Sequence, residues 1–226
     1  MLMINKRLEL VATYVTGRRL ADIGSDHAYL PLYLVKNKKI DFAIAGEIVE
    51  GPYKVSQKNV AQEGFSKIIE CRKAAGLDAI SLDDNIEVIT ICGMGGKLIA
   101  EILENGKGKL KSKPSLILQP NVGENFVRIK LQELGYKIDA EDIIEEDGHI
   151  YEIIVASFGK MNLTEDEINF GKFLTKEKPE LYIKKQNLEL EKINYILAQL
   201  KKSNNTQLEK IKVQEEKYKK IEALIQ

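Results

Sequence analysis

The sequence predicts an α/β fold in which a mostly parallel sheet is closed by an antiparallel hairpin and followed by a C-terminal helical hairpin. Short apolar segments alternate with helix-like segments up to residue 135. Two longer strand-like segments then flank Asp147–Gly148, a pair typical of a tight hairpin turn. Beyond residue 160, apolar residues recur at the 3, 4, 3 spacing of packed helices.

Five parallel strands are expected between residues 19 and 119. Each is short, apolar on both faces and separated from the next by a helix, as in sheets covered on both sides. The expected strands are Arg19–Ile23, Phe42–Gly46, Ile68–Arg72, Val88–Cys92 and Leu116–Gln119. The expected helices are Asn5–Tyr14, Tyr29–Lys36, Pro52–Glu63, Lys97–Glu104 and Phe126–Leu134. Tyr136–Glu146 and Ile150–Ser157 are expected to form the antiparallel hairpin.

The composition changes after Phe158, which predicts a first domain over residues 1–160 and a helical hairpin over 161–226. Thr164 and Glu167 form a capping-box pattern that starts a helix. Ser203–Asn205 is expected to separate two long helices. The apolar seam of the first helix is Leu190, Ile193, Leu197 and Leu200, and that of the second is Leu208, Ile211, Tyr218, Ile221 and Ile225.

Composition narrows the setting of the protein. The 226 residues carry 34 Lys and Arg against 34 Asp and Glu, so the net charge neither favours nor excludes a nucleic-acid partner. No apolar run approaches the ~20 residues of a membrane span. Two cysteines without CxxC spacing argue against disulfides and against a zinc site. We therefore expect a cytoplasmic protein that binds neither membrane nor metal.

The turn after the first strand indicates which cofactor the fold could bind. Only Gly24 and Ala28 are small enough for close backbone approach, so the GxGxxG fingerprint of dinucleotide binding is absent. Asp26 stands where a pyrophosphate would lie and would repel it. S-adenosylmethionine, which carries a sulfonium and an ammonium but no phosphate, suits this turn better than a nicotinamide dinucleotide.

Other candidate residues follow the remaining strands. Glu47 is placed to accept the two ribose hydroxyls, although a solvated strand end is the simpler alternative. Gly93–Gly96 opens space at the end of the fourth strand, and Gln119–Asn121 offers amides that could read a base edge. Asp22 is expected to fix the first turn, and His27 either stacks on the cofactor or packs. These positions should converge on one crevice.

The combination resembles the TrmK family of bacterial tRNA (adenine-N1)-methyltransferases that modify adenine 22. The resemblance spans nearly the whole chain and depends on Lys6–Leu8, Ala21–Pro31, Ala45–Glu47, Gly51–Tyr53, Ile91–Gly96, Leu118–Asn121, Tyr151–Ile153 and Met161–Thr164. It implies a class I, Rossmann-like methyltransferase core over residues 1–160 that binds S-adenosylmethionine and acts on tRNA. The cofactor site implied by the resemblance is Asp22, Gly24, Asp26, His27, Glu47, Gly93, Met94 and Gly95, and the candidate site also includes Ile48, Ala75 and Gly76.

One position departs from the family pattern. Family members carry Asn or Asp where Ala75 stands here, so the partner of the cofactor's adenine amine must be backbone or Asp78. For catalysis, Asp26 is expected to stabilise the charge that develops on the methylated base, with Asn121 holding the base edge and Tyr29 stacking on it. Lys107, Lys109, Lys111 and Lys113 are expected beside this site, where they either bind RNA phosphates or form a solvated loop.

Several alternatives stay open at this point. The core also suits a methyltransferase of another RNA or of a small metabolite, and a degenerate core could serve as a non-enzymatic binding module. The helical hairpin could bind RNA, pack on the core or pair two copies of the chain. A monomer is expected, with a homodimer through the hairpin as the alternative.

Overall fold

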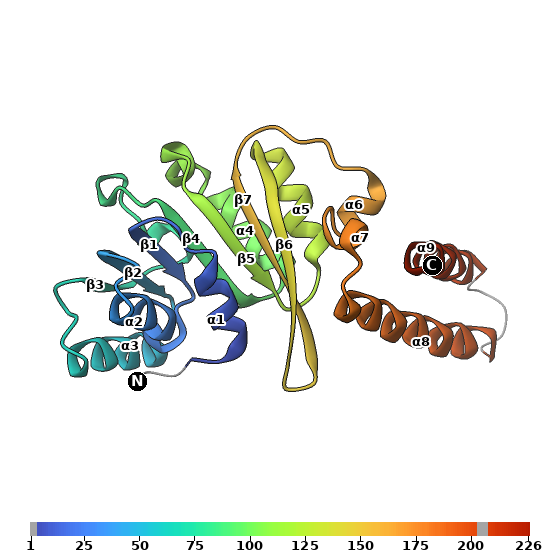
Figure 1. The fold of residues 1–226 in the computed structure, drawn as a ribbon, viewed down its shortest axis with the longest axis horizontal. Coiled ribbons are helices and arrows are strands. Elements are labelled where there is room, and N and C mark those ends of the chain that lie inside the picture. Colours follow the sequence, from blue (N-terminus) through green and yellow to red (C-terminus); the bar gives the residue numbers. More distant parts are fainter. Residues whose placement is uncertain (1–3, 203–207) are drawn as a thin grey trace. The chain divides into compact units, whose positions relative to one another are not determined.

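In the computed structural model, which describes residues 4–202 and 208–226, one mixed sheet organises the first part of the chain (Figure 1). Among these residues seven strands pair in the order β3-β2-β1-β4-β5-β7-β6. The strands are β1 Arg19–Ile23, β2 Phe42–Glu47, β3 Ile69–Lys73, β4 Val88–Met94, β5 Ser115–Pro120, β6 Tyr136–Glu146 and β7 His149–Phe158. The pairings among β1 to β5 are parallel, whereas β7 pairs antiparallel with both β5 and β6. The predicted mostly parallel sheet with a closing hairpin is confirmed.

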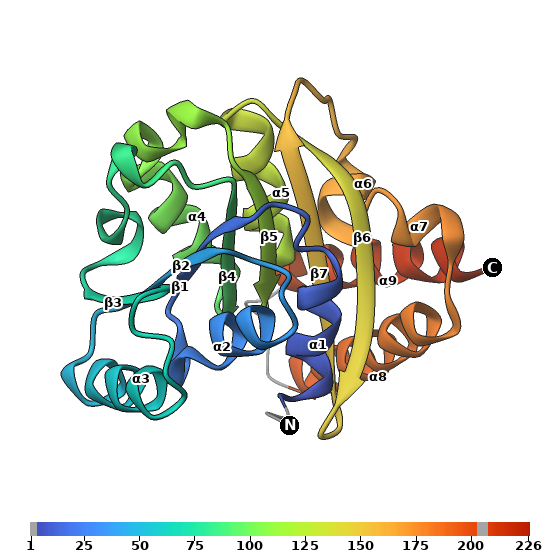
Figure 2. The same cartoon turned by 60° about the vertical axis from the view of Figure 1, so that its left-hand side comes forward.

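Helices cover both faces of this sheet. The helices of this part are α1 Lys6–Thr13, α2 Tyr29–Lys36, α3 Glu50–Gln62, α4 Gly96–Asn105, α5 Glu124–Glu133 and α6 Glu165–Phe170. Figure 2 shows α1, α2 and α3 in front of the sheet, with α4 and α5 behind it. Both faces of the central strands are therefore buried, and Ile44, Ile89 and Ile117 are fully covered. This explains why these strands are continuous apolar runs.

Local sequence signals account for most element boundaries. Asn5 caps α1 by accepting a hydrogen bond from the amide of Leu8 at 2.9 Å. The Thr164–Glu167 capping box forms as predicted and starts α6. Helix α3 starts at Glu50, two residues earlier than predicted from Pro52. Short 3₁₀ turns, which have no sequence periodicity of their own, were not expected at η1 Asp26–Ala28, η2 Gly76–Ala79, η3 Leu82–Asp84 and η4 Lys107–Ser112.

The lysine-rich segment η4 connects α4 to the start of β5. Helix α4 leaves the tip of β4 and returns the chain toward the start of β5, where Ser115 pairs with Val88, the first residue of β4. The Lys113 ammonium lies 4.2 Å from the ring centroid of Phe158, the last residue of antiparallel β7. Lys113 is therefore at the edge where the parallel strands begin. For Lys113 the expected position beside the strand tips is wrong, whereas Lys107 directly follows Gly106, a residue that lines the cavity described below.

Contacts divide the chain after Lys172, so residues 161–172, with α6, group with the sheet rather than with the hairpin. The second unit contains α7 Leu174–Glu177, α8 Glu180–Lys202 and α9 Leu208–Ile225. Ile193 and Ile221 are buried in this unit, and Lys217 pairs with Glu189 at 2.6 Å to join α9 to α8. Leu208, expected in the apolar seam, is 78% exposed.

The expected break at Ser203–Asn205 lies outside the described residues. Within residues 4–202 and 208–226, no helix combines the length and apolar character needed to cross a bilayer.

A buried ionic cluster joins α5 to the antiparallel strands. Arg128 on α5 is fully buried, and its Nε and Nη2 donate to Glu141 on β6 and Glu152 on β7 at 2.7 and 2.5 Å. Its Nη1 donates to the carbonyl of Ile168 at 3.3 Å. Burial by itself would lower the pKa of Arg128, but the two carboxylates outweigh this and raise it. The guanidinium is thus a charged cross-link among α5, β6, β7 and α6.

We predict that Arg128→Met lowers the free energy of unfolding by about 3–5 kcal/mol, because two buried carboxylates would lose their counter-ion. Denaturant unfolding followed by circular dichroism measures this loss. Lys130→Met is the matched control on the same helix, since Lys130 pairs with Glu104 and Glu133 near the surface. A loss for Arg128→Met no greater than that of the control would contradict the prediction.

Candidate active site

A cavity of about 790 Å³ opens at the carboxyl ends of β1, β2 and β4, where the sequence predicted a ligand crevice. Gly24, Glu47 and Gly93 all line it, so the three strand tips converge as expected. The other predicted site residues that line it are Asp22, Asp26, Tyr29, Ile48, Ala75, Gly76, Met94 and Asn121. His27 and Gly95 do not line this cavity.

The first turn requires glycine at position 24. Gly24 has φ +70°, and a Cβ there would lie 2.1 Å from Cε of Met94. The amides of Gly24 and Ser25 both donate to the carbonyl of Gly46, at 2.9 and 3.0 Å. These two amides therefore tie the tip of β1 to the tip of β2 instead of pointing at a ligand.

Asp22 lies beneath this turn at the edge of the cavity. Only 6% of the residue is exposed, and Oδ1 accepts a 2.6 Å hydrogen bond from the hydroxyl of Thr90 on β4. Burial raises the pKa of the Asp22 carboxyl, and its hydrogen bond with Thr90 opposes that rise. Asp22 thus links β1 to β4 directly under the site.

The chain turns sharply between Asp26 and Tyr29. His27 and Ala28 adopt left-handed backbone conformations, with φ values of 62° and 59°, each costing roughly 1–2 kcal/mol for a residue with a Cβ. Asn59 on α3 stabilises the turn by donating to the His27 carbonyl at 3.0 Å. The His27 ring packs edge-on against Tyr29, with centroids 5.4 Å apart, and its Nε2 lies 3.4 Å from Asp26 Oδ1. His27 therefore contacts two site residues without lining the cavity itself.

Glu47 ends β2, and its Oε1 accepts from the amide of Val49 at 2.9 Å, which orients the carboxylate. The Glu47 carbonyl accepts from the amide of Ala74 at 3.1 Å, bringing the segment Ala74–Asp78 beside the cavity. Asp78 lines the cavity together with Ala75. A carboxylate therefore lines the cavity beside Ala75, which has no polar side chain.

The tips of β4 and β5 are joined by side-chain amides. Gln119 is completely buried, and its Oε1 accepts from the amide of Gly93 at 3.0 Å. Its Nε2 donates to the Pro120 carbonyl at 2.8 Å and to Oδ1 of Asn121 at 3.2 Å. Asn121 in turn donates to the Gly93 carbonyl at 2.8 Å. Gln119 thus holds the turn and is not exposed to read a base, whereas Asn121 lines the cavity.

Sequence reasoning assigned no role to two walls of the cavity. The first turn of α1 contributes Asn5, Arg7 and Leu8, and the β6–β7 hairpin contributes Tyr151. Helix α4 adds Leu98, Glu101, Ile102 and Asn105. The only sequence signal for Arg7 and Tyr151 was that both belong to segments shared with the family.

The charges around the cavity restrict what it can bind. The charged residues that line it are Asp22, Asp26, Glu47, Asp78, Glu101 and Arg7. This acidic lining suits a cationic ligand and would repel a pyrophosphate. Among the residues that the structure describes, no cluster of three or more His, Cys, Asp or Glu could hold a metal. The site therefore fits a sulfonium cofactor better than a dinucleotide or a metal ion.

Comparison with known proteins agrees with this geometry. The family model described as TrmK, tRNA (adenine(22)-N(1))-methyltransferase, matches residues 20–223. The tRNA (adenine(22)-N(1))-methyltransferase of Bacillus subtilis is 42% identical over 95% of this chain and 92% of its own length. A Streptococcus pneumoniae protein solved in complex with S-adenosyl-L-methionine superposes with a TM-score of 0.92 at 46% identity, covering 99% of this chain and 100% of its own.

M. capricolum TrmK, solved in complex with S-adenosyl-homocysteine, superposes with a TM-score of 0.86 at 32% identity. That match covers 99% of this chain and 98% of the relative. These similarities extend over the sheet and over the C-terminal helices alike. The protein therefore belongs to the TrmK family of tRNA (adenine(22)-N(1))-methyltransferases.

Proposed function

We propose that this protein transfers the methyl group of S-adenosylmethionine to N1 of adenine 22 in tRNA, and that the cavity at the strand tips is where it does so. The observation that carries the proposal is the convergence of Gly24, Glu47 and Gly93 on one acid-lined cavity. Membership of the TrmK family supplies the substrate and the position. Neither the cavity nor the comparisons give similar support to a nicotinamide enzyme or to a non-enzymatic binding module.

In this proposal the cofactor is S-adenosylmethionine, which supplies an electrophilic methyl on a sulfonium. Glu47 would accept the ribose hydroxyls. Gly24, where a Cβ would collide with Met94, borders the same space. Asp78 takes the place next to Ala75, where it could accept from the adenine amine. Gly93 and Met94 border the same space from β4.

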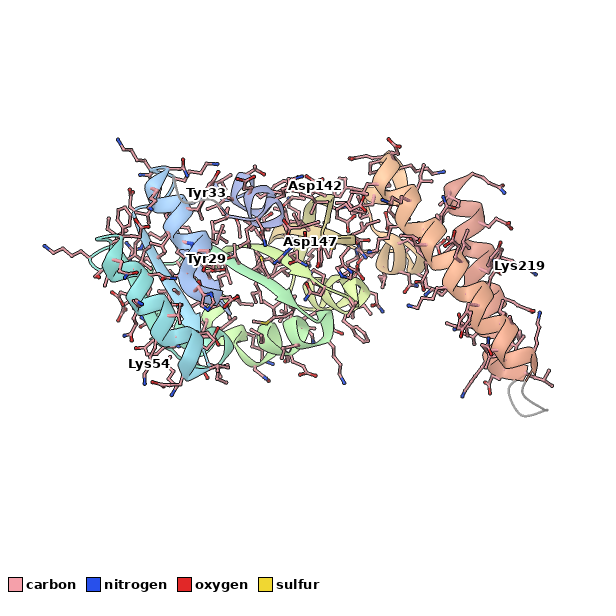
Figure 3. The ribbon with its side chains drawn as sticks, turned by 90° about the horizontal axis from the view of Figure 1, so that it is seen from below. Tyr29, Tyr33, Lys54, Asp142, Asp147 and Lys219 are labelled. Atoms are coloured by element: carbon pink, nitrogen blue, oxygen red, sulfur yellow. The ribbon has the colours of Figure 1, made fainter. Side chains whose placement is uncertain are left out.

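The main task of the protein in this reaction is to align N1 of adenine with the methyl group. N1 of adenine has a lone pair and needs no strong base, so the site must hold it in line with the methyl and exclude water. Methylation makes the base cationic, and Asp26 would stabilise that charge. Asn121 would hold the base edge, and Tyr29, at the start of α2, would stack on it. Figure 3 labels Tyr29 at the start of α2.

Access to N1 requires an unpaired base, because N1 is occupied in a Watson–Crick pair. Extruding the base costs a few kcal/mol. We further propose that the enzyme acts as a monomer in the cytoplasm, where tRNA is available. Residues 1–172 would carry catalysis, and residues 173–226 would serve as an appended helical hairpin.

The reaction is tested by incubating tRNA with the protein and labelled S-adenosylmethionine, then mapping the modified nucleoside. We expect one methyl group per tRNA, at N1 of adenine 22, and no label when residue 22 of the tRNA is changed to another base. Label at a different nucleotide, or only on small molecules, would contradict the proposal.

Glu47→Ala is expected to weaken S-adenosylmethionine binding by roughly tenfold or more, because a hydrogen bond to a charged group contributes about 1.5–3 kcal/mol. Isothermal calorimetry gives the Kd. Glu50→Ala is the matched control, since Glu50 is exposed on α3, pairs with Lys73 and does not line the cavity. Equal affinity for wild type and Glu47→Ala would exclude Glu47 from the cofactor site.

Asp26→Asn should reduce methyl transfer by about 100-fold or more, the loss typical of removing one electrostatic stabiliser of a transition state. The side chain of Asp26 is 75% exposed, so the fold should persist. Single-turnover methylation assays measure the rate, and Asp83→Asn, an exposed carboxylate away from the cavity, is the control. Turnover by Asp26→Asn at the wild-type rate would refute the role given to Asp26.

A further inference from the structure

The N-terminal helix and the β6–β7 hairpin meet at one end of the cavity, although they are far apart in sequence. Tyr14, which follows α1 as its C-cap residue, donates to Asp142 Oδ2 on β6 at 2.8 Å, and the amide of Arg7 donates to Glu146 Oε1 at 3.3 Å. Figure 2 shows α1 beside β6 over this stretch. The result is a wall that presents Arg7 and Tyr151 to the cavity.

The Arg7 guanidinium has partners on three separate elements. Its Nη1 donates to Gln119 Oε1 on β5, and its Nε lies 3.7 Å from Glu146 Oε2 on β6. Its Cζ also lies 5.3 Å from the ring centroid of Tyr151 on β7, within cation–π range. The side chain is 17% exposed, so it is held firmly while still reaching the cavity.

These contacts determine which way the carboxamides point. Gln119 Oε1 accepts from two donors, Arg7 Nη1 and the amide of Gly93. Its Nε2 must then face the opposite way, toward the Pro120 carbonyl and Asn121 Oδ1. Because Asn121 Oδ1 accepts from Gln119, the Nδ2 of Asn121 is left to donate to the Gly93 carbonyl. A single donor on Arg7 therefore helps to fix the orientation of both amides.

We propose that Arg7 is a positioning residue for the target base: through Gln119 it fixes the carboxamide of Asn121, and with Tyr151 it walls the end of the cavity that receives adenine. The inference extends the proposed function and depends on it. Without Arg7, Gln119 loses one of the two donors that distinguish its oxygen from its nitrogen, and Asn121 is free to take other orientations. Glu47 and Asp78, which border the cofactor end of the cavity, are not among the hydrogen-bond or ion-pair partners of Arg7, so cofactor binding should be unaffected.

The test compares Arg7→Ala, Asn121→Ala and the double variant in steady-state methylation of tRNA. We expect Arg7→Ala to lower kcat by about 10- to 100-fold, the effect of misplacing a reacting group by about 1 Å, while the Kd for S-adenosylmethionine changes less than about twofold. Because Arg7 acts through Asn121, the double variant should be no slower than the slower single variant by more than about twofold.

Two further variants separate positioning from charge and from folding. Lys6→Ala removes a neighbouring positive charge that is exposed and outside the cavity, and should leave turnover unchanged. Arg7→Lys keeps the charge but lacks the fork that reaches Gln119 and Glu146 together, so it should recover only part of kcat. Thermal unfolding and the S-adenosylmethionine Kd report whether each variant is folded.

Turnover by Arg7→Ala within about twofold of wild type, or losses that multiply in the double variant, would overturn the role of Arg7 alone. An equal loss of S-adenosylmethionine affinity and of kcat would also overturn it, since a general structural role has that signature. Failure of the wild-type protein to methylate adenine 22 would instead contradict the proposed function. The results for the variants bear only on the role of Arg7.

Discussion

The parallel register of β1 between β2 and β4 is the constraint on which the site depends. Ile23 pairs with Gly46 on one side and with Ile91 on the other, so the residues that follow all three strands emerge side by side. From β1 the sheet extends to β2 and β3 in one direction and to β4 and β5 in the other. Connections leave a crevice where the strand order reverses in this way. Gly24 and Glu47 line one cavity because the backbone hydrogen bonds between β1 and β2 hold the ends of the two strands side by side.

Two residues that carry a Cβ adopt left-handed backbone beside this crevice. Gly24 and Gly93 have positive φ, and His27 and Ala28 adopt the same left-handed region despite their side chains. Such strain persists only where surrounding structure enforces it. Here Ala28 is fully buried, and Asn59 holds the His27 carbonyl. The stability of the core thus maintains the turn that brings Asp26 and Tyr29 to the cavity.

Charged residues serve different roles in different parts of the structure. The chain is neutral overall, yet the cavity lining is acidic, as a cationic cofactor and a cationic methylated base require. Buried positive charge serves a different purpose. Arg128 joins helix to strands away from the cavity, whereas Arg7 is balanced by Glu146 and directs its donor at Gln119. Net charge could not have revealed this arrangement, because it averages over groups with separate functions.

From the sequence one obtains the strands, most helices and the glycines and carboxylates at the strand tips, because these follow from local periodicity, capping and the geometry of parallel sheets. The bounds of β1 and α2 were predicted to the residue. Only the tertiary structure showed that Arg7 and Tyr151 line the cavity and that Lys113 lies at the edge of the sheet where the parallel strands begin. The reason is physical: local patterns encode what a segment becomes, whereas the packing of α1 on β6 and the return path of α4 depend on contacts between distant segments.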